Sequence, residues 1–171
     1  MEEEFPVRMA AAAIAALLAL IVAIPLLYAP GTFSGLDGSP GRMDWTAPGG
    51  IDPVSAAVYA LGDLLCHQME SRSPVINGSE AAFCARDLSV MAGALAALIP
   101  LGFKRLRGTA ADPRAAACAL ALSSATFIEW AAEHALGAGA LFPRAASGAL
   151  TGVGLAVLLR AWAARLAAGG G

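Results

Sequence analysis

Charged residues are scarce in this sequence. Aspartate, glutamate, lysine and arginine make up 14% of its 171 residues, against about 25% in soluble domains. Hydrophobic residues make up 58%, and the mean hydropathy is +0.66. A small water-soluble domain could not cover that much apolar surface, and disordered chains have the opposite balance. The composition therefore excludes most soluble enzymes and indicates an integral membrane protein in a lipid bilayer.

Three further shortages narrow the function. The net charge is −2, so the chain lacks the basic face that binds nucleic acid. Three cysteines are too few for a scaffold built on disulfides. The sequence contains no glycine-rich phosphate loop followed by lysine and no Gly-x-Gly-x-x-Gly run, so no nucleotide cofactor is expected.

Four apolar stretches predict an all-α, polytopic membrane protein, in which a bundle of four transmembrane helices forms one integral membrane domain over residues 1–171. A spanning helix needs about 20 residues. Residues 9–28 supply that length without a charge, and the acidic start Met1-Glu2-Glu3-Glu4 favours a retained span over a cleaved signal peptide. Shorter runs, each extended by a polar turn, give the other spans: residues 84–103, 115–137 and 145–166. Three spans plus a surface helix is the alternative.

Residues 29–83 form the longest segment between two predicted spans. Glycine, proline, aspartate and serine are frequent in residues 31–50, which predicts an irregular loop. From Pro53 to Met69 apolar residues recur at helical spacing, and Asp52 before Pro53 is a suitable cap. This pattern predicts an additional amphipathic helix on the outer surface.

The distribution of arginine and lysine predicts the orientation. With the amino terminus inside, the inner segments hold Arg8, Lys104, Arg105, Arg107, Arg114, Arg160 and Arg165, and the outer segments hold Arg42, Arg72, Arg86 and Arg144. Cytoplasmic loops carry the excess of such residues. We therefore expect a multi-pass protein of the cell membrane with both termini in the cytoplasm.

Residues able to bind a metal ion are predicted to converge at one depth. Cys66 and His67 end the outer helix, and Cys84 and Asp87 share a face at the mouth of the second span. Thiolate, imidazole and carboxylate groups bind transition metals, so the four residues predict a site for zinc or another divalent transition metal. A Cys66–Cys84 disulfide on the oxidising side of the membrane is the competing interpretation. Asp63, one turn before Cys66, is expected to be a solvated interfacial charge.

Two acidic residues lie within the third predicted span. Glu129 and Glu133 are four residues apart and share a helix face. A carboxylate inside the membrane is costly unless it is paired, so it indicates a functional site. We expect Glu129 and Glu133 either to be catalytic or to pair with Arg144. Together with Arg86 and Arg72, Arg144 is also a candidate to hold an anionic head group.

The polar motifs resemble those of a family of small archaeal and bacterial integral membrane proteins of unknown function. The family signature is Cys-His-Gln, Pro-Glu-Arg-Ser and then Cys-Ala-Arg-Cys, and this chain has Cys66-His67-Gln68, Arg72-Ser73 and Cys84-Ala85-Arg86. Two later runs are similar to the family's Asp-Gly-x-x-Gln and Arg-x-x-Thr-Gly-x-x-x-Gly patterns: Glu129-Trp130-x-x-Glu133 and Arg144-x-x-Ser147-Gly148-x-x-x-Gly152. The resemblance covers about residues 61–155.

The chain departs from the family pattern at three positions. Asp87 stands where the family has its second cysteine, Glu129 where it has aspartate, and Glu133 where it has glutamine. Each departure keeps a potential ligand, which fits a coordination site better than a disulfide framework. The resemblance implies where a site lies and implies no reaction.

Three classes of function remain open from the sequence. A metal site at the outer ends of the helices predicts a metal-dependent hydrolase for a lipid-linked or small-molecule substrate. Cys66 and Cys84 as a redox pair predict a membrane thiol–disulfide oxidoreductase. Glu129, Glu133 and His134 as a proton relay predict a small transporter, and the chain would otherwise be a structural subunit of a membrane complex.

Overall fold

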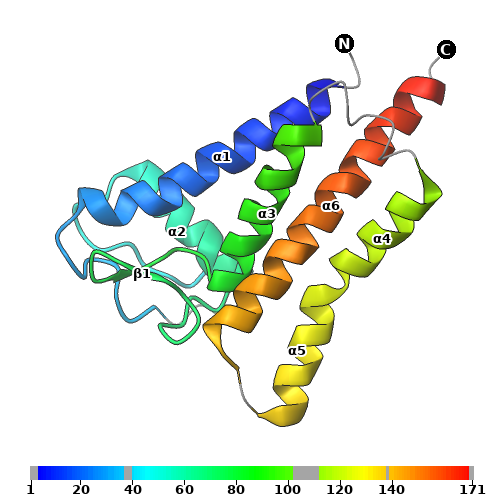
Figure 1. Ribbon diagram of the computed structural model, residues 1–171. Helices are drawn as coiled ribbons and strands as arrows, with labels where there is room; N and C mark the ends of the chain where they lie inside the picture. The colour runs from blue at the N-terminus through cyan, green and yellow to red at the C-terminus, as the bar shows by residue number, and fades with distance from the viewer. Residues whose placement is uncertain (1–3, 37–39, 102–111, 138, 170–171) are drawn as a thin grey trace.

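A computed structural model describes residues 4–36, 40–101, 112–137 and 139–169 (Figure 1). The regular elements of these residues are, in chain order, α1 (Glu4–Leu27), α2 (Pro53–Leu65), β1 (Val75–Ile76), β2 (Ser79–Glu80), α3 (Ala85–Leu101), α4 (Pro113–Ser123), α5 (Ala125–Leu136) and α6 (Leu141–Gly169). The strands form one antiparallel hairpin. The helical passes run in alternating directions, so that the first turn of α1 and the last turn of α6 lie at the same end of the molecule (Figure 1).

Three helical segments of the described residues are long and apolar enough to cross a membrane: Glu4–Leu27, Pro113–Leu136 and Leu141–Leu166. They confirm the helical membrane fold and coincide with the spans predicted at residues 9–28, 115–137 and 145–166. The second predicted span corresponds to α3, which has 17 described residues and lies beside α6 (Figure 1). Its crossing of the whole bilayer stays a prediction. The end of this predicted span and the cationic cluster of Lys104, Arg105 and Arg107 lie outside the described residues.

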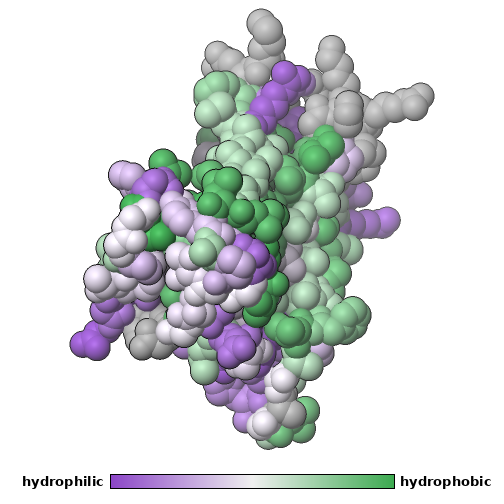
Figure 2. All heavy atoms as spheres, turned by 90° about the vertical axis from the view of Figure 1, so that its left-hand side faces the viewer, coloured by the Kyte–Doolittle hydropathy of each residue, from purple (hydrophilic) through white to green (hydrophobic). Residues whose placement is uncertain are grey.

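The bundle exposes a large apolar surface. Val22 and Leu26 on α1 are 49% and 60% exposed, and Phe127 on α5 is 68% exposed. Figure 2 shows hydrophilic residues gathered toward the lower part of one face, while apolar residues cover much of the helical surface above them. Lipid chains can cover such a surface without the free-energy cost of exposing apolar side chains to water.

Glycines bring the backbones of α3 and α6 into contact. A Cβ atom added at Gly152 would lie 2.0 Å from the carbonyl oxygen of Val90, and one at Gly93 would lie 2.2 Å from that of Ala149. Helices in membranes associate largely through such close packing of small residues. A hydrophobic core also joins α1 to α3 and α6. Its buried residues are Val7, Ala94, Leu98, Leu101, Ala156 and Ala163.

The third pass is broken in its middle, where the sequence predicts one continuous helix. α4 ends at Ser123, and α5 starts at Ala125. The Thr151 hydroxyl of α6 lies at the break, 2.8 Å from the Thr126 hydroxyl, and it accepts a hydrogen bond from the Thr126 N–H at 3.2 Å. A hydroxyl from a neighbouring helix thus satisfies a backbone group that a break inside a membrane would leave unpaired.

The amphipathic helix begins where predicted and ends sooner. Asp52 caps α2 by accepting hydrogen bonds from the N–H groups of Val54 and Ser55, and Pro53 occupies the first turn. The helix ends at Leu65, not at Met69, because the backbone is extended at Cys66 and has a positive φ of 44° at Gln68. The chain turns back at this point toward α3.

The buried face of α2 differs from the predicted apolar stripe. Val58 is buried, but Leu65 is 59% exposed. Tyr59 instead faces the core, where its ring stacks on Phe33 at 4.0 Å between centroids. The core of the segment before α3 comprises Ile21, Ile24, Phe33, Val58, Tyr59, Ala81, Ala82 and Phe83. The exposed apolar residues of α2, Val54, Leu61 and Leu65, therefore remain available to contact lipid.

Buried carboxylates organise the loops around this core. Asp63 is 1% exposed and accepts hydrogen bonds from the N–H groups of Asp44 and Trp45, each at 3.0 Å. The expectation that Asp63 is solvated is wrong, because loop residues 44–45 fold over it. Glu80 is 4% exposed and binds loop N–H groups in the same way, at residues 35 and 36.

We expect Gly152→Ala to weaken the bundle. The added methyl group would collide with the α3 backbone, and overpacking of this kind costs about 1–3 kcal/mol. Thermal unfolding of the protein in detergent should show a lower midpoint. Gly49→Ala is the control, since a Cβ at Gly49 would meet nothing within 4 Å, and an equal loss in both variants would contradict the proposed contact.

We expect Asp63→Ala to release the loop around Trp45. The substitution leaves two loop N–H groups without their buried acceptor, which costs about 1–3 kcal/mol. Trypsin should then cut after the exposed Arg42 faster than in the wild type, at equal protein and protease concentrations. Asp44→Ala removes an exposed carboxylate from the same loop and should leave the cleavage rate unchanged.

Candidate metal and ion-pair site

Two cysteines and an aspartate meet between α2 and α3. Cys66 follows α2, Cys84 precedes α3, and Asp87 lies in the first turn of α3. The two sulfur atoms and a carboxylate oxygen all lie within 4.8 Å of one another. The Cys84 Sγ lies 3.2 Å from the Asp87 carboxylate. The structure thus brings together three of the four predicted metal ligands, and both cysteines are free thiols.

The sulfur of Cys66 is surrounded by hydrogen-bond donors. The backbone N–H of Cys84 donates to it at 3.1 Å, and the backbone N–H of Gln68 donates to it as well. The Cys84 thiol is the strongest of these influences, and together the donors lower the pKa of the Cys66 thiol against the opposing effect of burial. The surroundings of Cys66 therefore favour a thiolate.

The fourth predicted ligand, His67, does not join this group. Its side chain is exposed, whereas its neighbours Cys66 and Gln68 are buried. The backbone is extended at Cys66, and successive side chains of an extended chain point to opposite sides. The sequence analysis placed Cys66 and His67 on the outer helix. Because α2 ends at Leu65, before both residues, helical spacing does not apply to them.

Gln68 is a positioning residue that the sequence argument overlooked. Its side-chain amide is fully buried and donates hydrogen bonds to the carbonyl oxygens of Tyr59, at 3.1 Å, and Ala82, at 2.8 Å. It thereby ties the end of α2 to the chain that enters α3, and Gly62 makes room for this contact. The one available signal was the place of Gln68 in the Cys-His-Gln run.

Three arginines and two glutamates form an ion-pair network beside the cysteines. Arg86 on α3 contacts Glu129 at 2.5 Å and Glu133 at 3.3 Å. Arg144 on α6 contacts Glu133 at 2.5 Å, and Arg72 lies 3.7 Å from the same carboxylate. Glu133 is therefore the centre of the network. Among the described residues, Arg144 forms its ion pair with Glu133, whereas the ion-pair partner of Glu129 is Arg86.

The network carries one more positive than negative charge among the described side chains. Arg72 is its most accessible member, with a side chain that is 35% exposed. Glu129 and Glu133 also line a cavity of about 280 Å³. Their catalytic role stays a prediction. His134 is exposed, and its Nδ1 lies 2.9 Å from the carbonyl oxygen of Trp130.

The cysteine group and the ion-pair network adjoin each other. Arg86 and Asp87 are consecutive residues of α3. The carbonyl oxygen of Arg72 accepts a hydrogen bond from the N–H of Ala85 at 2.8 Å, and Cys84 lies within the electrostatic reach of Arg144. The two groups of candidate residues therefore adjoin each other at one end of the bundle, and His67 belongs to neither group. Their common depth in the membrane stays a prediction.

The fold and this polar end define a class: a helical membrane protein with a thiol and carboxylate cluster where its helices meet a loop-rich segment. The chain belongs to the predicted membrane protein family DUF2085, a family of unknown function, whose model matches residues 66–158. The matched range begins at Cys66 and includes every residue of the two clusters. No curated protein and no solved structure shows significant similarity to the chain.

We expect Glu133→Gln to destabilise the protein strongly. Removal of one partner leaves the buried Arg144 without its ion pair, which costs about 3–5 kcal/mol. The midpoint of thermal unfolding in detergent should fall by far more than in Glu70→Gln, which makes the same change at an exposed site. Equal midpoints for these two variants would show that the network contributes nothing to stability.

Proposed function

We propose that this protein binds a divalent transition metal, most simply zinc, through Cys66, Cys84 and Asp87 at one end of its membrane bundle. The observation that carries the proposal is the approach of the three ligand atoms to within 4.8 Å of one another. Two thiolates and one carboxylate are a donor set that zinc accepts.

The surroundings of the three residues support this proposal. Donation by the N–H groups of Cys84 and Gln68 stabilises a thiolate at Cys66, and metal ligands in proteins are commonly oriented by such secondary contacts. Cys66 and Asp87 come from different elements, so the ion would also fasten the end of α2 to α3.

Three protein ligands suit a site that acts on a substrate. Structural zinc sites have four protein ligands as a rule, whereas catalytic sites have three and keep one position for another molecule. Zinc in such a site acts as a Lewis acid. This supports hydrolysis of a membrane-linked substrate as the reaction class, with the neighbouring arginines available to orient an anionic group.

A second candidate is a thiol–disulfide oxidoreductase coupled to a membrane quinone. It is favoured by the presence of two adjacent free thiols, of which Cys66 is the better nucleophile. In this reaction the two thiols lose two electrons and two protons and form one S–S bond. A quinone of the membrane takes up the two electrons and the two protons and becomes a quinol. The two candidates use the same sulfur atoms and therefore exclude each other in one molecule.

Elemental analysis with a thiol count distinguishes the two candidates. We expect the protein purified without chelator to hold about one zinc ion per chain, since one three-ligand site binds one ion. Cys66→Ser and Asp87→Ala should lose it. Cys118→Ser should keep it, because Cys118 is exposed on α4, away from the cluster.

The contrary outcomes are equally clear. A metal-free wild type with three free thiols would refute the metal site. A metal-free wild type with one free thiol, which Cys118→Ser reduces to none, would establish a Cys66–Cys84 disulfide, and its reduction by a quinol would then separate a redox couple from a structural brace.

A further inference from the structure

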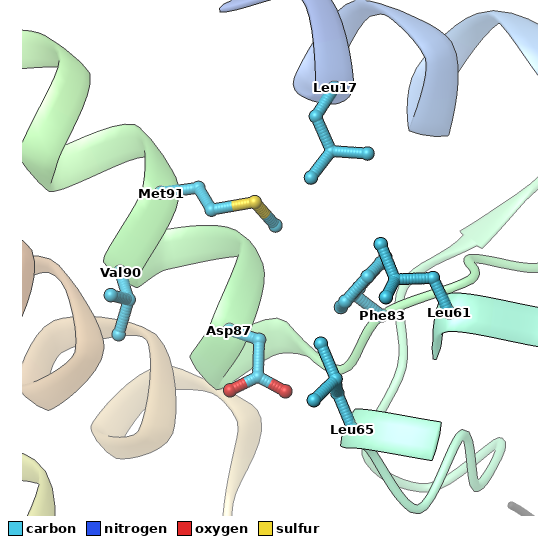
Figure 3. A pocket seen from close by; sticks show the side chains of 7 residues that line it. All are labelled: Leu17, Leu61, Leu65, Phe83, Asp87, Val90 and Met91. Atoms are coloured by element: carbon cyan, nitrogen blue, oxygen red, sulfur yellow. The ribbon is translucent and has the colours of Figure 1, made fainter. Parts of the chain in front are cut away.

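A cavity between α1, α2 and α3 adjoins the cysteine cluster. Its volume is about 380 Å³, within the range of small-molecule sites. Leu17 of α1, Leu65 of α2 and Met91 of α3 surround it, and Figure 3 shows the Asp87 carboxylate at its edge. Phe83 and Leu61 complete the wall on the side of α2.

The cavity is apolar except at one place. Asp87 is the only charged residue among the described residues that line it, the others being Leu17, Leu61, Leu65, Phe83, Val90 and Met91. Asp87 also belongs to the group formed with Cys66 and Cys84. A ligand with an apolar body in the cavity would therefore place its polar end at the proposed metal site.

The surface around the cavity is suited to a bilayer. Leu61 and Leu65, which form part of its wall, are 38% and 59% exposed. Leu20 and Val22 on α1, beyond the wall residue Leu17, are 37% and 49% exposed. Because α1 is one of the membrane-spanning candidates, hydrocarbon chains of the bilayer have direct access to this opening.

One arginine of the adjoining network is available to an anionic head group. Arg86 immediately precedes Asp87, and with Asp87 counted the three arginines of the network stand beside three carboxylates. Among the described side chains, Arg72 forms an ion pair with Glu133 at 3.7 Å and is the most exposed of the three arginines, so its guanidinium group is the most available for another anion. Guanidinium groups bind phosphate through paired hydrogen bonds.

We propose that the cavity binds one hydrocarbon chain of a membrane lipid whose head group carries a phosphate, and that Arg72 of the adjoining network binds this phosphate. The proposal rests on the proposed function and names the substrate class of that site. Binding of the chain itself needs the cavity alone, so it can be tested separately from the metal.

Photolabelling in lipid nanodiscs tests the occupant. The probe is phosphatidylglycerol with a diazirine in one acyl chain, and diacylglycerol with the same chain is the probe without phosphate. We expect phosphatidylglycerol to label peptides that contain Leu17, Leu61 or Met91 about tenfold more than diacylglycerol does, which corresponds to about 1.4 kcal/mol of binding free energy.

Two pairs of variants locate the binding. Leu61→Trp fills the cavity and should abolish the labelling of its walls, while Val54→Trp on the exposed face of the same helix should not. Met91→Trp fills the cavity from α3 and serves if Leu61→Trp does not fold. Arg72→Gln should remove the preference for phosphatidylglycerol, and Arg42→Gln, in the exposed loop, should keep it.

The results that overturn the proposal are distinct from those that overturn the metal site. Equal labelling of all lipid-facing helices, or labelling that persists in both cavity-filling variants, would refute a chain in the cavity. Equal labelling by the two probes would refute the phosphate, and displacement by an isoprenoid quinone alone would identify a different occupant. Loss of zinc in Cys66→Ser with cavity labelling retained supports both proposals, whereas labelling of a wild type that binds no metal refutes the metal alone.

Discussion

Glycines allow the backbones of α3 and α6 to touch, and the polar end of the molecule depends on this contact. Gly152 lies against Val90, and one turn nearer the polar end Gly148 lies against the carbonyl oxygen of Arg86. Arg86 and Arg144, one on each helix, are thereby brought to the same carboxylate, Glu133 of α5. In a membrane no water is available to hydrate three separated charges, so helix packing and charge pairing depend on each other.

The segment between α1 and α3 follows a different principle. Its described residues form one helix and one short hairpin, and its loops would leave many backbone N–H groups without partners. Buried side chains supply those partners: Asp63 and Glu80 accept from loop N–H groups, while Gln68 donates to carbonyl oxygens. This is the general condition for burying irregular backbone. It explains why so small a segment contains so many buried polar residues.

The cysteine group lies where these two regions join. Cys66 is held by the loop-rich segment, and Asp87 is held by the bundle, so a ligand that binds both would connect them. The arginine network on one side and the apolar cavity on the other give the same location a charged and an apolar boundary. A lipid has this division within one molecule, which makes the site suited to an amphiphile.

Most of the fold could be predicted from the sequence, because apolar runs of the length of a bilayer determine helices wherever they occur. The resemblance to the family and the start of α2 at its Asp52 cap are likewise local signals, and both are confirmed. Tertiary contacts decided the rest. Thr151 of α6 meets the break in the third pass, loop residues 44–45 cover Asp63, and the turn at Gln68 directs His67 away from Cys66 and Cys84. Each of these depends on residues distant in the chain or on one backbone angle, whereas helix periodicity extends only over neighbouring turns.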